Sequence, residues 1–247
     1  TAMELTMKTL PVRRYAKFIL FSLFACFFAS NSSHATTNLP LDPFKLYSKN
    51  IKFDVFRNNK KVGNHNITFY HLNDDKFKVI AEMDLSVRFL SIPLYSYSYR
   101  SEATWQQNKL TDLTSEQNDD GITTNVNVIS AEKSLLIKGP SGNITADRHL
   151  YPTNHWHAGV LSQKQVINTL NGKVANVKIA EIESEQILAE GKTISANRYQ
   201  YSGDVETTVW YDNAGRWVKM QFNGKGGSVI DYRCIECGIT KGMQKGG

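Results

Sequence analysis

The chain lacks a hydrophobic run long enough to cross a membrane. Its most apolar block, from Phe18 to Ala29, has twelve residues. As a helix this block would rise about 18 Å, well short of the roughly 30 Å hydrocarbon core that a transmembrane helix must cross. The sequence therefore predicts no permanent membrane span.

The same block fits a secretory signal peptide over residues 1–35. Lys8 and Lys17 bound a basic segment before it, and Ser33 and Ala35 supply small side chains after it. This order indicates export and cleavage after Ala35. We therefore expect a periplasmic or secreted protein.

Two details of the leader have alternatives. Met7 opens the most compact leader, so residues before it need not belong to the signal. Leu23-Phe24-Ala25-Cys26 is similar to a lipid-attachment signal, but Phe24 is bulky and apolar residues follow Cys26. A lipoprotein acylated at Cys26 is therefore the less favoured prediction.

Cysteine is scarce, with three in the chain, and only Cys234 and Cys237 lie outside the leader. An oxidising compartment favours their pairing. Residues three apart on an extended strand have Cα atoms about 10 Å apart, whereas a disulfide needs less than about 7 Å. A bond between them therefore requires a turn at Ile235-Glu236. Unpaired or intermolecular thiols, and a redox or metal role, are the alternatives.

Clustered charge of one sign is also missing. The formal net charge is +6, of which residues 1–35 contribute +3, and the remaining charges are dispersed. Nucleic-acid binding typically shows a basic stripe interleaved with aromatic residues. The sequence therefore predicts no nucleic-acid partner.

Common catalytic signals are lacking too. The chain has no Gly-x-Ser-x-Gly nucleophile motif and no βαβ spacing typical of a parallel nucleotide-binding sheet. We expect no cofactor, and a non-enzymatic protein is favoured over an enzyme.

What the chain does have is a succession of short segments rich in Val, Ile, Thr, Tyr and Phe, starting at Ile51. Turn residues separate them about every ten residues, as at Asn58-Asn59, Asn118-Asp119-Asp120-Gly121, Asn171-Gly172 and Asn223-Gly224. This pattern predicts hairpins in an all-β fold, a single antiparallel sheet that is strongly curved or an open barrel. We expect ten to twelve strands.

The predicted domain covers residues 51–237. An irregular lead, residues 36–50, precedes it, and a flexible tail, residues 238–247, follows. One short helix is expected within residues 158–170, where apolar residues recur at three- and four-residue spacing after Thr153 and Asn154, which are suitable caps.

Alternation supports the strand prediction. Tyr95, Tyr97 and Tyr99 alternate with serines, and the stripe continues to Trp105. Near the C-terminus, Val218, Met220 and Phe222 are predicted to face the interior, with Trp217, Lys219 and Gln221 on the polar face.

The aromatic stripe suggests a binding site. Aromatic walls with a few polar groups are typical of small-molecule pockets. The sequence therefore proposes Tyr95, Tyr97, Tyr99, Trp105 and Trp156 as ligand-binding residues. The alternative is an ordinary aromatic core, which the same residues would fill equally well.

Histidines gather between His149 and His157. On an extended segment, His155 and His157 would point to the same side and, with His149, form weak candidates for a metal site. A further ligand would come from His65, His71, Asp120 or Asp147. The alternative is a loop in which the histidines bond to backbone.

Several segments together resemble a secreted bacterial family of domains of unknown function, DUF6134-like and more distantly DUF3108-like. They are Lys61–His65, Tyr97–Trp105, Asn118–Gly121, Pro152–Trp156, Asn168–Gly172, Trp210–Asp212 and Gly215–Val218. The resemblance spans nearly all of residues 51–233. It implies an exported all-β envelope protein and carries no catalytic residue or cofactor. The architecture is also similar to the half-barrels of periplasmic lipoprotein carriers.

The leading hypothesis is a periplasmic carrier or binding module for a lipid or another amphipathic small molecule. The alternatives are a metal-dependent enzyme centred on the histidines, and a structural or assembly factor with an envelope protein partner. The sequence does not select the ligand or the oligomeric state.

Overall fold

The computed structural model describes residues 42–47, 49–73, 75–90 and 92–239. The predicted signal peptide, the cleavage position at Ala35 and the lipid-attachment candidate Cys26 all lie outside the described residues, as does the tail from residue 240 onward.

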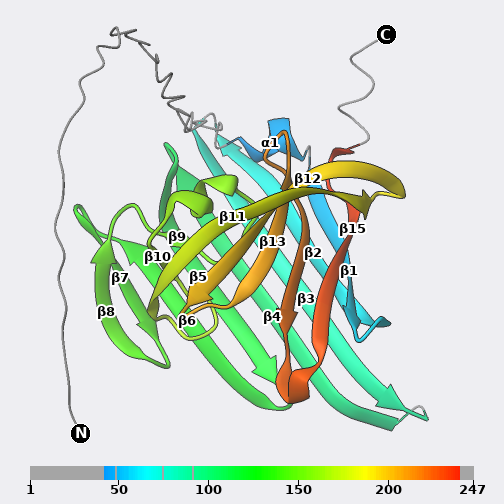
Figure 1. Ribbon diagram of the computed structural model, residues 1–247. Helices are drawn as coiled ribbons and strands as arrows, with labels where there is room; N and C mark the ends of the chain where they lie inside the picture. The colour runs from blue at the N-terminus through cyan, green and yellow to red at the C-terminus, as the bar shows by residue number, and fades with distance from the viewer. Residues whose placement is uncertain (1–41, 48, 74, 91, 240–247) are drawn as a thin grey trace, which may run out of the picture. The chain divides into compact units, whose positions relative to one another are not determined.

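The described residues form a sheet of fifteen strands (Figure 1). The strands are β1 Asn50–Arg57, β2 Lys60–Asn73, β3 Lys76–Phe89, β4 Ile92–Gln106, β5 Lys109–Asp119, β6 Ile122–Ser130, β7 Ser134–Gly139, β8 Gly142–Asp147, β9 Tyr151–Pro152, β10 Gln165–Ile167, β11 Val174–Ala189, β12 Lys192–Gly203, β13 Thr207–Asp212, β14 Trp217–Asn223 and β15 Val229–Glu236. The helices are α1 Pro43–Leu46 and the 3-10 helices η1 Ala158–Ser162 and η2 Lys225–Gly227.

The sheet consists of two meanders, β1–β8 and β9–β15. The chain passes from the first to the second between β8 and β9, the two edge strands of the sheet. From β8 the order descends strand by strand to β1, then passes to β15 and descends again to β9. All neighbours are antiparallel except β9 and β10, which are parallel. The first and last strands, β1 and β15, therefore pair in the middle of the sheet.

The sheet curves until its two edges approach each other. The edge strands β8 and β9 are joined by residues 148–150 alone, a connection that spans at most about 15 Å. No ladder joins these two strands in the described sheet. The predicted all-β fold, one strongly curved and unclosed antiparallel sheet, is therefore confirmed.

Three details differ from the prediction. Fifteen strands exceed the expected ten to twelve, and two of them, β9 and β10, have only two and three residues. The expected helix within residues 158–170 is a 3-10 helix of five residues, followed by β10. Its N-cap is His157, not Thr153 or Asn154. The lead contains α1, capped by Asp42.

A bulge changes the predicted face of Trp217. Trp210 of β13 pairs with Lys219, but the next residue, Tyr211, pairs with Trp217, so β14 carries an extra residue at Val218. Trp217 is fully buried and faces the interior with Met220 and Phe222, instead of lying on the polar face with Lys219. A bulge of this kind shifts the alternation by one residue.

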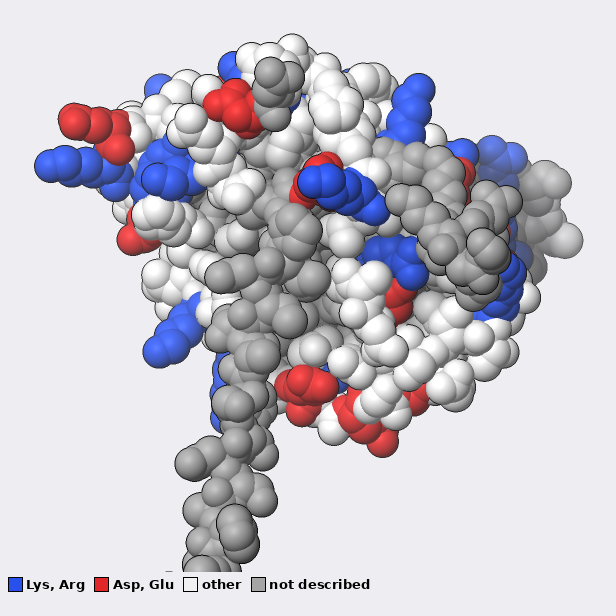
Figure 2. Space-filling view, turned by 90° about the horizontal axis from the view of Figure 1, so that it is seen from above, with Lys and Arg blue, Asp and Glu red and all other residues white. Residues whose placement is uncertain are grey.

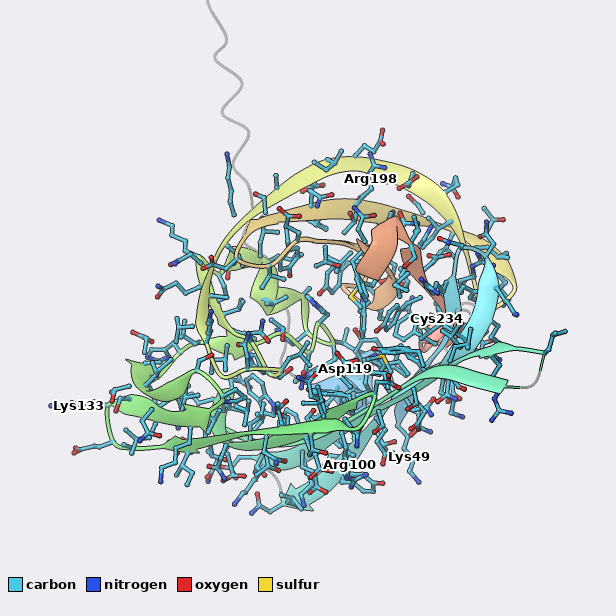
Figure 3. The ribbon with its side chains drawn as sticks, turned by 90° about the horizontal axis from the view of Figure 1, so that it is seen from below. Lys49, Arg100, Asp119, Lys133, Arg198 and Cys234 are labelled. Atoms are coloured by element: carbon cyan, nitrogen blue, oxygen red, sulfur yellow. A yellow bond between two sulfur atoms is a disulfide. The ribbon has the colours of Figure 1, made fainter. Side chains whose placement is uncertain are left out.

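Charged side chains of both signs are scattered over the outside of the sheet. On the face seen from above, Lys and Arg are interspersed with Asp and Glu (Figure 2). Arg100 and Arg198 lie on opposite outer sides of the curved sheet (Figure 3), where they bond to Glu102 and Glu183 at 2.7 and 2.6 Å. Within the described residues, no helix has the length and hydrophobicity needed to cross a membrane.

Candidate ligand-binding cavity

One half of the sheet's interior is packed with aromatic rings. Trp156 lies at the centre of this cluster, with ring centroids 5.6 Å from Phe69, 5.9 Å from Phe77 and 5.6 Å from Trp105. Trp105 and Trp156 are each 2% exposed. Edge-to-face contacts of this kind add to the stability that ring burial supplies, so this half is a closed core.

The segment that carries Trp156 is held in the interior by two tyrosines. The Tyr47 hydroxyl donates to the Trp156 carbonyl (2.6 Å) and accepts from the Trp217 amide (2.7 Å). The Tyr211 hydroxyl donates to the His155 carbonyl (2.8 Å). Buried backbone polar groups need such partners, and these three bonds fix where the packed core ends.

The other half of the interior is hollow. A cavity of about 690 Å³ lies between β1–β4 and β13–β15, with residues 153–155 and 168–170 across one side. Pockets of about 300 to 1,000 Å³ are typical for small-molecule ligands. Arg57 and Glu206 are the two charged side chains among the residues that line it.

Strand register arranges one wall in rows. His65, Met83 and Tyr99 are directly paired across β2, β3 and β4. The next rows toward the β3–β4 hairpin are Leu85 with Tyr97, and Val87 with Tyr95. Tyr99 is buried, whereas Tyr95 and Tyr97 are partly exposed. The rows therefore run from a buried end of the cavity toward an open rim.

The opposite wall is apolar and aromatic. Met220 and Phe222 of β14 pair with Tyr232 and Ile230 of β15, and all four line the cavity. Trp217 continues this wall toward the buried end. The cavity is thus lined mainly by carbon surface, with polar groups confined to a few positions.

A hydrogen-bonded cluster closes the buried end beside Tyr99. The Tyr99 hydroxyl donates to the Thr169 hydroxyl (2.9 Å) and lies 3.4 Å from Asn154 Oδ1. The Ser115 hydroxyl donates to the Thr169 carbonyl (2.5 Å). A tyrosine hydroxyl is uncharged at neutral pH, and burial raises the pKa of Tyr99 still further above its usual value.

His65 is the least expected side chain of this wall. It is 9% exposed and lies among the rings of Phe53 (6.5 Å), Trp217 (5.8 Å) and Tyr232 (5.5 Å). Neither of its ring nitrogens has a hydrogen-bond partner among the described residues. Burial lowers the pKa of His65 to about 3, and the nearby His155 lowers it in the same direction.

His155 faces the same cavity from residues 153–170, the segment that crosses the interior, called here the crossing segment. Its backbone has φ +50°, and the Trp156 amide donates to the Asn154 carbonyl (2.6 Å) across it. A non-glycine residue in this region is strained, and the bond from Tyr211 helps to hold it there. Its ring lies 5.7 Å from Trp217, and Nδ1 has no partner among the described residues. Burial lowers its pKa to about 4.

The residues proposed from the sequence separate into two groups. Tyr95, Tyr97 and Tyr99 line the cavity, whereas Trp105 and Trp156 lie in the packed core and are not among the lining residues. The stripe is therefore continuous along β4, but only its half toward the β3–β4 hairpin faces open space.

The histidines proposed as metal ligands are not gathered. His149 is exposed, and His157 caps η1 by accepting a bond from the Gly159 amide at Nδ1 (2.9 Å). Of His149, His155 and His157, only His155 lines the cavity. Among the described residues, no group of three or more His, Cys, Asp or Glu side chains is placed to hold a metal ion.

Sequence reasoning missed several lining residues. His65 was considered only as a further metal ligand, although it alternates along β2 with the buried Ile67 and Phe69 on the interior face. A polar residue in this apolar series could have indicated a lining position. No sequence pattern indicates that Trp217 lines the cavity, because the face on which it lies depends on the bulge in β14.

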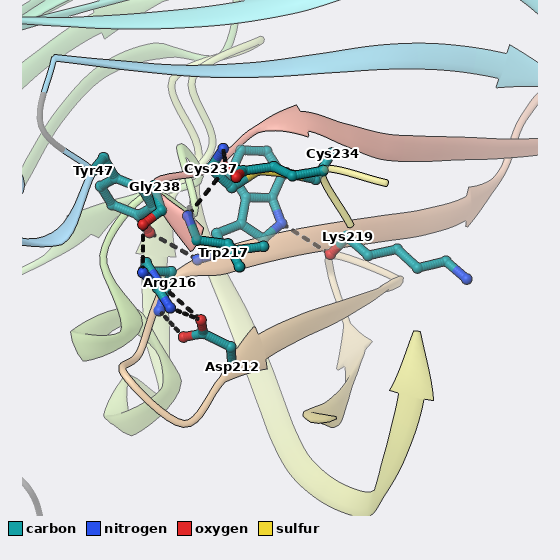
Figure 4. The surroundings of a disulfide bond; sticks show 10 residues. Tyr47, Asp212, Arg216, Trp217, Lys219, Cys234, Cys237 and Gly238 are labelled. Atoms are coloured by element: carbon teal, nitrogen blue, oxygen red, sulfur yellow. Dashed lines mark hydrogen bonds and ion pairs between the residues drawn. A yellow bond between two sulfur atoms is a disulfide. The ribbon is translucent and has the colours of Figure 1, made fainter. Parts of the chain in front are cut away.

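Cys234 and Cys237 are joined by a disulfide at the packed end (Figure 4). Their Cα atoms are 6.1 Å apart, because β15 is bulged at Ile235: Lys52 pairs with Glu236 and Phe53 with Cys234. The expected turn is therefore a bulge within a strand. Ile239, two residues later, is buried and its amide donates to Glu190 Oε1 (3.1 Å).

The same end carries a buried ion pair. Arg216 Nη2 lies 2.7 Å from Asp212 Oδ2, and the side chains of Asp212 and Arg216 are 7% and 15% exposed. Arg216 Nη1 also donates to the Gly238 carbonyl (2.5 Å), next to the disulfide (Figure 4). The C-terminal end of β15 is thus fastened to the β13–β14 turn.

Comparison with known proteins supports the fold. The chain is similar to the crystal structure of a beta-barrel-like protein of the domain of unknown function DUF1849 from Brucella abortus, with a TM-score of 0.55 and 9% sequence identity. The match covers 77% of this chain and 97% of the other. At this identity the likeness shows the fold alone. No curated protein matches the chain.

The sequence itself gives the family. Residues 53–235 match the family described as Domain of unknown function (DUF6134). This match includes every strand from β2 to β14 and most of β1 and β15, so it spans the cavity and the packed core alike. The chain therefore belongs to the DUF6134 family.

Proposed function

We propose that this protein is a binding or carrier module that holds an apolar or amphipathic small molecule in the cavity beside Tyr95, Tyr97 and Tyr99. The observation that carries the proposal is the hollow half of the interior: about 690 Å³ lined mainly by apolar and aromatic side chains. Folded interiors are normally close-packed. The other half of this interior, around Trp156, is packed in that way.

The charge distribution supports a largely uncharged ligand. Arg57 and Glu206 are the charged side chains among the lining residues, and Glu206 is exposed. Burial keeps His65 and His155 neutral by lowering their pKa values. A charged group buried beside these two neutral histidines would lose its hydration without gaining an opposite charge.

The proposed site of action is the bacterial envelope, after export. The support is the leader pattern of residues 1–35 together with the disulfide between Cys234 and Cys237, since disulfides persist in oxidising compartments. Cell fractionation with intact-mass measurement tests this. We expect a periplasmic species that begins at Thr36, and a full-length cytosolic species would contradict it.

A fluorescent probe tests binding. N-phenyl-1-naphthylamine is uncharged and becomes fluorescent in apolar surroundings. Titrated into residues 36–247, it should bind saturably at one site. Leu85→Trp places a large ring in the row that contains Tyr97 and should weaken binding at least tenfold.

Ile129→Trp is the matched control, because Ile129 is exposed on the outer face of β6. It should leave probe binding unchanged. If the wild type does not bind, or both tryptophan variants bind as the wild type does, the cavity is not a binding site.

A further inference from the structure

The inward face of β1 ends on an arginine. Ile51, Phe53 and Val55 occupy alternate positions of this strand and are buried, and Arg57 takes the next position in the same series. Side chains two residues apart lie on the same face of a strand, and Arg57 lines the cavity. An apolar series therefore ends on a positive charge where β1 reaches the β1–β2 turn.

Arg57 has no partner from the described part of the protein. Its side chain forms no ion pair or hydrogen bond with a described residue, whereas every other described arginine donates at least one side-chain hydrogen bond. Arg57 is partly exposed, and its nitrogens are not among the described buried atoms that lack a partner. A ligand group at the rim can therefore reach them.

A second cation lies beside Arg57. Arg57 and Lys60 are directly paired across the β1–β2 hairpin, so their side chains lie on the same face of the sheet, with Cβ atoms about 5 Å apart. Lys60 is exposed and also forms no ion pair with a described residue. Like charges in directly opposed positions are destabilising, and a bound anion would offset this repulsion.

Glu206 does not neutralise this pair. It is the acidic side chain among the lining residues, and it precedes β13. In the sheet β15 and β14 lie between β1 and β13, so three strand spacings, about 14 Å along the sheet, separate the two backbones. Glu206 is also exposed, where salt screens its charge.

The buried end of the cavity has no such charge. His65 lies in the row of Phe53 and is neutral at neutral pH, because burial lowers its pKa to about 3. Four residues of β1 separate Phe53 from Arg57, about 13 Å of strand. An amphiphile that lies along this distance has its apolar part beside neutral side chains when its head is beside Arg57.

We propose that Arg57 and Lys60 bind the acidic head group of a single-chain amphiphile. The molecule enters tail-first, so that its chain lies in the cavity and its head stays at the rim. A guanidinium presents a planar set of donors that matches a carboxylate or a phosphate. This inference rests on the proposed function and adds the chemical class and the direction of the ligand.

Dodecanoate and dodecan-1-ol test the head group, because they have the same number of carbon atoms and differ in charge. Each competes with N-phenyl-1-naphthylamine on residues 36–247 at about pH 8, where a carboxylate is ionised. We expect dodecanoate to bind roughly fivefold to tenfold more tightly, as one charge-assisted hydrogen bond would give. Added salt should weaken the binding of dodecanoate more than that of the alcohol.

Variants of the hairpin assign the preference. Arg57→Met should lower the affinity for dodecanoate by at least about fivefold, while the affinities for the alcohol and the probe change less than about twofold. Arg57→Lys, which keeps a positive charge, should retain part of the preference. Lys60→Met should have a smaller effect than Arg57→Met, because Lys60 is exposed.

Lys61→Met is the matched control. It removes a positive charge from the same hairpin on the opposite face, where Lys61 pairs with Phe56 and its Nζ lies 2.6 Å from Asp54 Oδ1. It should leave the affinities for dodecanoate and the alcohol unchanged. Circular dichroism checks that each variant is folded.

The outcomes separate the two proposals. If the wild type binds the probe and both compounds, but dodecanoate no more tightly than the alcohol, head-group recognition is wrong and the binding function stands. The same holds if the preference survives Arg57→Met, or if Lys61→Met weakens it equally. If the wild type binds neither the probe nor the compounds, both proposals are wrong. Should Arg57→Met not fold, the wild-type ratio, its salt dependence and Lys60→Met decide.

Discussion

The interior of this sheet has two halves that the same strands build in opposite ways. In one half, the crossing segment inserts Trp156 among Phe69, Phe77 and Trp105. In the other, the segment presents His155 and Asn154 to an open space. Because β2, β3 and β4 supply side chains to both halves, the curvature of the sheet alone does not explain the cavity. The cavity begins where the crossing segment no longer fills the interior with a large side chain such as Trp156.

The largest predicted effect is at the packed half. Trp156→Ala should lower the free energy of unfolding by about 3 to 5 kcal/mol, the usual loss for a buried large aromatic residue. Phe222→Ala, a matched aromatic truncation on the cavity wall where Phe222 is half-buried, should cost about 1 to 2 kcal/mol. Urea denaturation measures both. Equal losses would mean that the two halves are packed alike.

Acid should destabilise the cavity half. The pKa values of His65 and His155 are lowered from 6.5 to about 3 and about 4, so above pH 6.5 both are neutral whether the chain is folded or unfolded. Below pH 6.5 the unfolded chain binds protons that the folded chain does not. Stability is therefore lost as pH falls toward 4, by up to about 1.4 kcal/mol per pH unit for each histidine.

His65→Leu isolates this contribution from that of the carboxyl groups. Between pH 7 and 4, the free energy of unfolding should fall less steeply for His65→Leu than for the wild type. Asn64→Leu, at the exposed neighbouring position of β2, is the control and should show the same slope as the wild type. A slope that His65→Leu leaves unchanged would show that His65 is protonated, or accessible to protons, in the folded protein.

The disulfide should matter less than Trp156. It closes a short loop at the packed end, for which the loop-entropy relation gives about 2 kcal/mol. Cys234→Ser combined with Cys237→Ser should lose about that amount in urea denaturation while the probe binds as before. A loss of probe binding would show that the packed end and the cavity are coupled.

Removing one hydroxyl group at a time distinguishes two cavity tyrosines. Tyr97→Phe removes a partly buried bond to Gln117 (2.9 Å) and should cost about 1 kcal/mol or less. Tyr99→Phe removes the buried donor to Thr169 and should cost about 1 to 3 kcal/mol, since a buried acceptor loses its partner. The reverse order, measured by thermal or urea unfolding, would contradict the assignment of the buried end.

Local pattern predicted much of this molecule. Alternation in β4 identified the interior face from Tyr95 to Trp105, and turn residues located most hairpins, because both depend on neighbours along the chain. The pairing of β1 with β15 has no local signal. Neither has the bulge that turns Trp217 inward, nor the path of residues 153–170 across the interior.

The candidate site was predicted in part for the same reason. The three tyrosines of β4 belong to a visible stripe, and all three line the cavity. Which part of that stripe faces open space depends on Trp156, a residue brought there by bonds from Tyr47 and Tyr211. His65 and His155 meet only through the strand register and the crossing segment, and so no spacing in the sequence relates them.

The most direct test of the account is a crystal structure of residues 36–247 grown with dodecan-1-ol. The account predicts electron density for one elongated molecule in the cavity, with its chain beside Leu85 and Tyr97. A structure in which the protein's own side chains fill that space, with no bound molecule, would contradict it.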